Sequence, residues 1–184
     1  MAKLVSKTYG DALFELALEE NKTDTLFEES KVLREVFQKN EELVKLLNHP
    51  KINKEEKIQL IENIFGGRAS KDMIGFLTII IKKERQKEIT GILDYFISAV
   101  KEYKKIGVAY VTTAFELSDE KKKSIVDKLI ATTNYKEIEM NYIVDESVIG
   151  GMIIRIGDRV VDSSIRTKID KMSRELMQLH ISSS

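Results

Sequence analysis

The sequence predicts an α-helical bundle of six helices as an amino-terminal domain, residues 1–105, followed by a small α+β domain, residues 106–184. Apolar residues recur with helical periodicity through the first hundred residues. The 184 residues include one proline and nine glycines, which leaves room for long unbroken helices. From Gly107 onward, stretches rich in β-branched and aromatic residues alternate with helical ones, which is typical of a small mixed domain.

The first three predicted helices follow from apolar stripes and local stop signals. The second helix is expected to begin at Thr25, because Glu28 three residues later completes a capping-box spacing. A short third helix follows Asn40 and must end near His49, because Pro50 disfavours the helical conformation in the residue before it. The stripe of the first helix consists of Val5, Tyr9, Ala12, Leu13, Leu16 and Ala17.

The next two helices are bounded by clear capping signals. Asn53 and Glu56 repeat the cap spacing at the start of the fourth helix, and Gly66-Gly67 is expected to end it. The fifth helix begins after Ser70, and its wide apolar arc predicts a central position in the bundle. That arc consists of Met73, Ile74, Phe76, Leu77, Ile79, Ile80 and Ile81.

A sixth helix is predicted from about Ile89 to Lys104, after which the pattern changes to strands. Val108–Ala114 suits a strand, and Ser118 is a candidate cap for a helix that follows it. Ile138–Val144 alternates as a second strand.

Two further strands and a helix complete the chain. The strands, Met152–Ile156 and Arg159–Val161, flank Gly157-Asp158, and glycine at the first of two turn positions predicts a tight hairpin. The last helix begins near Ser163 or Ser164. Its stripe consists of Ile165, Ile169, Met172, Leu176 and Leu179.

Composition excludes several classes of protein. The 30 basic and 30 acidic residues give a net charge of zero and no basic stripe, so nucleic-acid binding is not expected. The absence of cysteine excludes disulfides, thiolate metal sites and cysteine nucleophiles. No apolar run approaches the roughly 18 residues that a membrane-spanning helix needs, and the opening residues lack a signal-peptide pattern.

No group of residues has the spacing that catalysis or metal binding requires. His49 and His180 have no companion ligand at a helical spacing. Neither Gly66-Gly67 nor Gly150-Gly151 belongs to a phosphate-binding loop, and Asp162-Ser163-Ser164 is explained by a helix cap. We therefore expect no catalytic residue, no bound metal and no cofactor.

What stands out instead is an excess of apolar side chains on the first and fifth helices. Tyr9, Leu13 and Leu16 on the first helix, and Phe76 with Ile79–Ile81 on the fifth, exceed what a small bundle needs. These residues have two interpretations, a groove for a partner helix or ordinary core.

Three stretches resemble the delta, or oligomycin-sensitivity-conferring, subunits of rotary ATP synthases. Tyr9–Ala17 is similar to the opening helix of that family, and Val111–Glu120 to the start of its second domain. Val144–Ile165 is close to the family signature around its Gly-Gly and Ile-Gly-Asp elements. The departures are few: Phe115-Glu116 stands where the family often has proline, and Ser163 where it often has glycine.

The resemblance implies a non-catalytic subunit of a bacterial F-type enzyme, present once per complex. It implies that the first domain binds the amino termini of the alpha subunits of the catalytic head. The second domain would meet the b subunits of the peripheral stalk, so the chain would associate peripherally with the cytoplasmic side of the cell membrane. The candidate contacts are Tyr9, Ala12, Leu13, Leu16, Phe76, Leu77, Ile80 and Ile81 for the head, and Ile165, Ile169, Met172 and Leu176 for the stalk.

Three alternatives are tested by simple observations. A helical adaptor outside the ATP synthase shares the bulk features and fails only on the signature stretch. A nucleic-acid-binding protein would show salt-sensitive RNA binding, against which the neutral charge argues. An enzyme would need a constellation of reactive side chains, and none was found.

Overall fold

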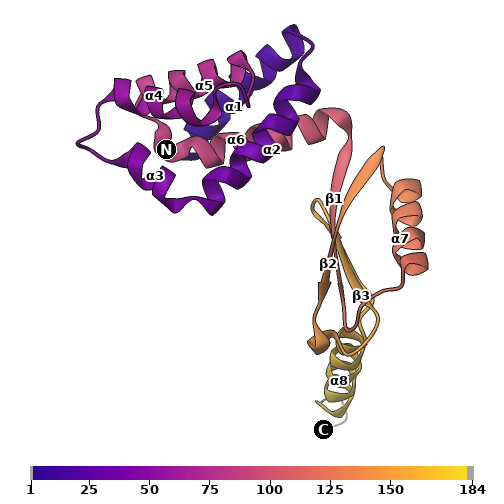
Figure 1. Ribbon diagram of the computed structural model, residues 1–184. Coiled ribbons are helices and arrows are strands. Elements are labelled where there is room, and N and C mark those ends of the chain that lie inside the picture. The colour runs from indigo at the N-terminus through magenta and orange to yellow at the C-terminus, as the bar shows by residue number, and fades with distance from the viewer. Residues whose placement is uncertain (1, 182–184) are drawn as a thin grey trace. The chain divides into compact units, whose positions relative to one another are not determined.

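The computed structural model describes the backbone of residues 2–181 and the side chains of residues 2–174. The chain divides between Tyr103 and Lys104 into two compact units, each with its own secondary structure. A helical amino-terminal region followed by a small mixed sheet is confirmed (Figure 1). The described residues form eight α-helices, of which six precede the sheet: α1 (Ala2–Glu19), α2 (Thr23–Lys39), α3 (Glu41–Asn48), α4 (Lys54–Phe65), α5 (Lys71–Lys82) and α6 (Ile89–Lys104), with the 3-10 turn η1 (Gln86–Glu88) before α6.

The predicted start of the second helix at Thr25 is wrong. Helix α2 begins at Thr23, and the residue before it makes no side-chain cap hydrogen bond. The reason is a tight reversal after α1, in which Asn21 has a positive φ of 54° and Thr23 Oγ1 donates to the carbonyl of Ala17 at 3.2 Å. Glu28 accepts a hydrogen bond from Lys31 rather than closing a cap.

The other helix boundaries of this unit follow the predicted local signals. A capping box opens α4, with Glu56 N donating to Asn53 Oδ1 at 2.8 Å and Asn53 N to Glu56 Oε2 at 3.3 Å. Ser70 Oγ accepts from Met73 N at 3.2 Å at the start of α5. His49 is extended, as the following proline requires.

One apolar core joins the six helices. Leu13 from α1, Leu77 from α5 and Phe96 from α6 are completely buried in it. Helix α1 approaches α6 closely at Gly10, where a Cβ atom would overlap the ring of Tyr95. The Tyr95 hydroxyl donates to Asp11 Oδ1 at 2.8 Å, so this contact also fixes the register of the two helices.

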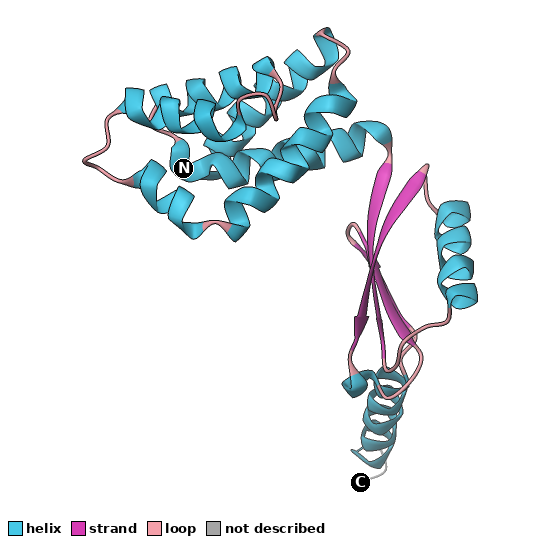
Figure 2. Ribbon diagram, viewed as in Figure 1, coloured by secondary structure: helices cyan, strands magenta, loops and turns pink. Residues whose placement is uncertain are grey.

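The second unit is built on a four-stranded sheet with strand order β2-β1-β3-β4. Strands β1 and β2 are parallel, and the other two pairings are antiparallel. The helix α7 connects the parallel pair and lies along the sheet (Figure 2). The elements are β1 (Ile106–Thr113), α7 (Asp119–Thr132), β2 (Glu137–Val144), the 3-10 turn η2 (Glu146–Val148), β3 (Met152–Ile156), β4 (Arg159–Asp162) and α8 (Ile165–Ile181).

A small core lies between α7 and one face of the sheet. It is formed by Val111, Leu117 and Ile125, with Leu129, Met140, Met152 and Ile154 packed around them. The predicted hairpin is confirmed: β3 pairs with β4 across Gly157, whose φ is +55°. On the strands, Tyr110 pairs with Arg155, whose guanidinium lies 4.9 Å from the tyrosine ring.

Candidate interaction surfaces

Among the described residues, no group of histidine, cysteine or carboxylate side chains has the arrangement that would hold a metal ion. His49 Nδ1 accepts a hydrogen bond from Lys51 N at 3.2 Å within a turn, and His180 lies outside the described side chains. None of the described helices combines the length and the apolar character that crossing a membrane requires.

The structure places the predicted head-binding residues at very different depths. Leu13, Leu77, Ile80 and Ile81 are 0–1 % exposed, and Phe76 is 7 % exposed, so all five belong to the core. Sequence periodicity assigned them to the right helix faces but gave no measure of depth. They support any surface on α1 and α5 from beneath and do not line it.

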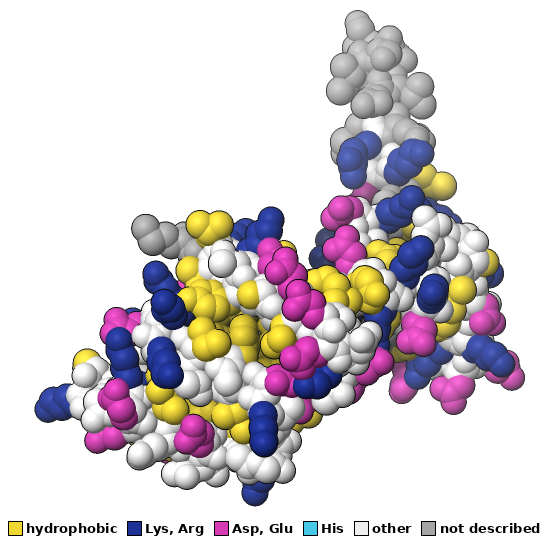
Figure 3. Space-filling model, turned by 90° about the horizontal axis from the view of Figure 1, so that it is seen from above, with side chains coloured by type: hydrophobic (Ala, Val, Ile, Leu, Met, Phe, Trp, Pro, Cys, Tyr) yellow, Lys and Arg dark blue, Asp and Glu magenta, His cyan; other side chains and the backbone are white. Residues whose placement is uncertain are grey.

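The other predicted contact residues of α1, and one further residue of the apolar arc of α5, reach the surface. Tyr9 and Leu16 are half-buried against the core, and Ala12 is exposed. Ile79, also on the apolar arc of α5, is 51 % exposed. Figure 3 shows hydrophobic side chains gathered on one face of the helical unit within a rim of charged ones. This is the arrangement expected of a surface that receives another protein.

An ion pair ties the beginning of α2 to α5 at one end of this unit. Lys22 Nζ lies 2.6 Å from Asp72 Oδ2 and also contacts the Glu20 carboxylate. These two partners, Asp72 first, hold the pKa of Lys22 above its usual range.

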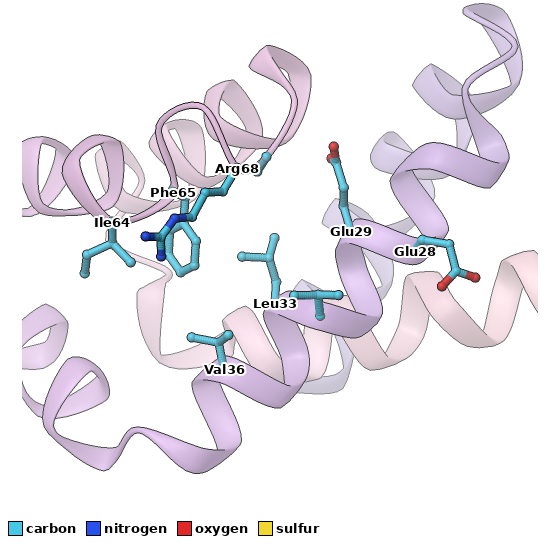
Figure 4. Close-up of a pocket in the computed structure, with 9 residues that line it drawn as sticks. Glu28, Glu29, Leu33, Val36, Ile64, Phe65 and Arg68 are labelled. Atoms are coloured by element: carbon cyan, nitrogen blue, oxygen red, sulfur yellow. The ribbon is translucent and has the colours of Figure 1, made fainter.

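A second apolar surface lies between α2 and α4 and was not predicted. Leu33 and Val36 from α2 face Ile64 and Phe65 from α4 across a hollow of about 390 Å³ (Figure 4). Val32, which is 60 % exposed, extends the apolar lining onto the surface of α2. Val32 was the residue in the sequence that could have indicated this surface, because it is apolar and falls outside the buried stripe of α2.

Charged groups border the hollow. Glu28, Glu29 and Arg68 contribute to its lining. Glu29 is already engaged, since its two carboxylate oxygens accept from Ser70 N at 2.8 Å and Ser70 Oγ at 2.7 Å. This contact connects the middle of α2 to the cap of α5, so the shape of the hollow is tied to the packing of the bundle.

In the second unit, a cap of three residues fixes the start of α8. Asp162 Oδ1 accepts from Ser164 N at 2.8 Å, and Asp162 Oδ2 accepts from Thr167 Oγ1 at 2.7 Å. Ser164 Oγ in turn accepts from Thr167 N at 3.2 Å. The predicted role of Asp162-Ser163-Ser164 as a helix cap is confirmed.

The hydrogen bonds of this cap predict that acid destabilises the second unit. Hydrogen bonds from Ser164 and Thr167 lower the pKa of Asp162 below the ordinary 3.8. A carboxylate with a lowered pKa stabilises the fold above its unfolded pKa, and this contribution is lost as pH falls through the folded pKa. We expect the Asp162→Asn variant to lose less thermal stability than the parent chain between pH 5 and pH 2.

Circular dichroism melts at several pH values measure this difference. The Asp158→Asn variant, which removes a charge from the hairpin turn instead, is the matched control. Equal acid sensitivity of the Asp162→Asn variant and the parent chain would contradict the prediction.

The described part of α8 carries an apolar stripe whose side chains stay partly exposed. Ile165, Ile169 and Met172 are 43 %, 52 % and 63 % exposed. Leu176, the fourth predicted residue of this stripe, lies outside the described side chains. A surface helix normally turns its apolar stripe toward a core, so an exposed stripe indicates a protein partner.

The fold and these surfaces define a class of protein, a two-unit protein that presents exposed apolar side chains on both units. Comparison with known proteins identifies the family. The family model for the ATP synthase delta (OSCP) subunit matches residues 5–176. The chain therefore belongs to the ATP synthase delta (OSCP) subunit family.

Relatives match along almost the whole chain. It is 59 % identical over 181 residues to the ATP synthase subunit delta of Lachnoclostridium phytofermentans, covering 98 % of this chain and 100 % of the relative. It is 35 % identical to that of Desulforamulus reducens, covering 94 % and 95 %. A chain in the cryo-EM structure of the Toxoplasma gondii mitochondrial ATP synthase hexamer shares the fold, with a TM-score of 0.74, 15 % identity, and coverage of 94 % and 97 %.

Proposed function

We propose that this chain is a non-catalytic subunit of the F1Fo ATP synthase and part of its peripheral stalk. It links the catalytic head to the stalk and is needed for coupling proton translocation to ATP synthesis. The observation that carries this proposal is the match to the delta subunit of Lachnoclostridium phytofermentans along 98 % of the chain at 59 % identity. The exposed apolar surfaces on both units support it, because a connecting subunit needs two separate contacts.

The helical unit is proposed to bind the amino-terminal helices of the alpha subunits. Tyr9, Ala12 and Leu16 on α1 and Ile79 on α5 would contact them, since these side chains reach the surface. An amphipathic helix that lies on such a surface is held by its apolar face. The core residues beneath keep the surface rigid: Leu13, Phe76, Leu77, Ile80 and Ile81.

The second unit is proposed to bind the b subunits of the stalk through the exposed stripe of α8. Ile165, Ile169 and Met172 would make this contact, with Leu176 continuing it. One copy per complex would then lie at the cytoplasmic face of the bacterial cell membrane, attached through the complex.

The proposed role is mechanical. Rotation of the central shaft applies torque to the head, and without a stationary connection the head would turn with the shaft. Buried apolar area resists this torque at about 25 cal/mol per Å², before the entropy lost on association is subtracted. No reactive side chain is required for this task.

Reconstitution tests the proposal directly. Membranes depleted of this subunit should lose proton-driven ATP synthesis and regain it when the purified chain is added. ATP hydrolysis by the detached head should not change. Coupling that survives depletion, or that the added chain does not restore, would exclude the proposed function.

A single charge on α5 should weaken attachment to the head. We expect the Ile79→Glu variant to bind the head with about thirtyfold lower affinity, because roughly 2 kcal/mol of apolar burial is lost. Calorimetry measures this change as the purified chain binds to heads that lack the subunit. The Leu46→Glu variant is the matched control, because Leu46 is 46 % exposed on α3. Equal binding by the two variants would remove α5 from the contact.

A further inference from the structure

Helix α7 covers only part of one face of the sheet. It packs against β2, the strand at one edge of the order β2-β1-β3-β4. The axes of four strands span about 14 Å, at about 4.8 Å per step, whereas a helix with its side chains is about 10 Å across. A helix that lies over the β2 edge therefore reaches β1 but does not reach β4.

A hollow of about 460 Å³ lies beside α7 on this face. Met152 and Ile154 from β3 line it and are only partly buried, and Ile125 and Leu129 line it from α7. Phe115 also lines the hollow and is 58 % exposed. The hollow is thus apolar on the sheet, on the helix and at the loop between β1 and α7.

Strand β4 extends this apolar surface. Val161 is the register partner of Ile154, and opposite residues of an antiparallel pair place their side chains on the same face. Val161 is 63 % exposed. Its neighbour Val160 pairs with Arg155 and lies on the other face of the sheet. The hollow and Val161 together form a groove alongside α7, which we call the α7 groove.

The charged side chains that line the hollow are both basic. They are Lys121 and Lys128, which lie two turns apart on α7. Among the described residues, neither lysine makes an ion pair or a side-chain hydrogen bond. Both ammonium groups are therefore free to meet acidic side chains of another molecule.

The acidic residues next in sequence to these groove residues are directed elsewhere. Glu116 Oε1 lies 3.8 Å from Lys122 Nζ. Glu120 and Asp127 line a separate hollow on the other flank of α7, which Lys128 also borders. Asp162 lies on the opposite face of β4, where both of its carboxylate oxygens cap α8. The α7 groove is therefore apolar at its base and positively charged along α7.

Size and charge together indicate what fits the α7 groove. The width left on the sheet accommodates one helix, which would complete the helical layer beside α7. The α8 helix of this chain or of a second copy fits poorly, because residues 165–174 carry four basic side chains and one acidic side chain. These basic side chains would repel Lys121 and Lys128, whereas a helix with acidic flanks is attracted.

We propose that the α7 groove binds one amphipathic helix of another protein. The apolar stripe of this helix lies on Met152, Ile154 and Val161, and its acidic side chains lie beside Lys121 and Lys128. The inference goes beyond the proposed function, because this contact is separate from the stripe of α8. It gives the second unit a second surface that binds a helix.

The test measures binding of the full chain to two synthetic helical peptides with the same leucine stripe, flanked by glutamate or by lysine. The parent chain should bind the glutamate peptide about tenfold more tightly than the lysine peptide. The Val161→Asp variant should bind the glutamate peptide about tenfold more weakly than the parent chain, because apolar burial is lost and a like charge is added. The matched control is Val160→Asp, which changes a residue 59 % exposed on the other face of the same strand and should bind as the parent chain does.

A charge reversal on α7 gives an independent measurement. The double variant Lys121→Glu, Lys128→Glu should prefer the lysine peptide. The Lys123→Glu variant is the control, because Lys123 lines the hollow on the other flank of α7, and it should keep the parental preference. All three lysines are exposed, so these variants should melt close to the parent chain.

Several outcomes would overturn the inference. Equal binding of the glutamate peptide by the Val161→Asp and Val160→Asp variants would exclude the groove. The acidic partner would be excluded if the parent chain bound neither peptide or bound both equally, or if the double lysine variant kept the parental preference. Dimerisation of the chain in sedimentation that the Val161→Asp variant abolishes would assign the groove to a second copy. Reconstituted coupling tests the proposed function separately, so either proposal can fail without the other.

Discussion

The Leu13→Glu variant is expected to lose the folded helical unit. Leu13 is completely buried in the core that joins the six helices. Losing the buried leucine side chain costs about 2–5 kcal/mol of stability, and burying a carboxylate in an apolar core costs more. The sum, about 5 kcal/mol or more, matches the whole stability of a typical small domain. Far-UV circular dichroism in a urea titration measures the loss.

The comparison with Ile79→Glu makes this prediction specific. Both changes put a carboxylate on an apolar helix face, but Ile79 is 51 % exposed and Leu13 is not exposed at all. We therefore expect the Ile79→Glu variant to melt as the parent chain does while binding to the head weakens. A Leu13→Glu variant with parental stability would show that Leu13 lies at the surface.

The second large effect is expected at Gly151, in the loop between η2 and β3. Its φ is +74°, and a Cβ atom there would overlap the carbonyl oxygen of Ser163 and lie 3.1 Å from Ser164 Cα. Both obstacles are backbone atoms, and they belong to the segment that begins α8. We expect the Gly151→Ala variant to destabilise the second unit by about 3 kcal/mol.

Gly67 supplies the matched control for this change. Its φ is +75°, nearly the same, but a Cβ atom there would meet nothing within 4 Å. The Gly67→Ala variant should therefore show only the conformational cost, about 1 kcal/mol. Thermal melts of the two variants separate the steric from the conformational contribution. Equal losses would mean that the loop at Gly151 relaxes.

Helix boundaries could be predicted wherever the signal was local. The cap at Asn53, the extended residue before Pro50 and the cap of α8 each depend on side chains within a few residues. The start of α2 was missed because it depends on a reversal between two helices that the sequence marks only weakly. Asn21 and Thr23 create that reversal, and Thr25 has no part in it.

Depth could not be predicted from periodicity. An apolar stripe identifies the face of a helix that turns inward. Which side chains of that stripe are fully buried depends on how the helices pack. Leu13 and Ile79 both lie on predicted apolar arcs, yet one is core and the other surface. The positive φ of Ile149, 66°, was equally hidden, because isoleucine rarely adopts this conformation.

Strand β2 has a consequence for the chain when it is free of partners. In the described sheet it pairs with β1 alone, so its other side faces no strand of that sheet. Glu137 and Glu139 place negative charges along the first half of β2. Its last three residues, Tyr142, Ile143 and Val144, carry no charge. Such an edge recruits further strands. We therefore expect the isolated chain to be prone to aggregation through this edge.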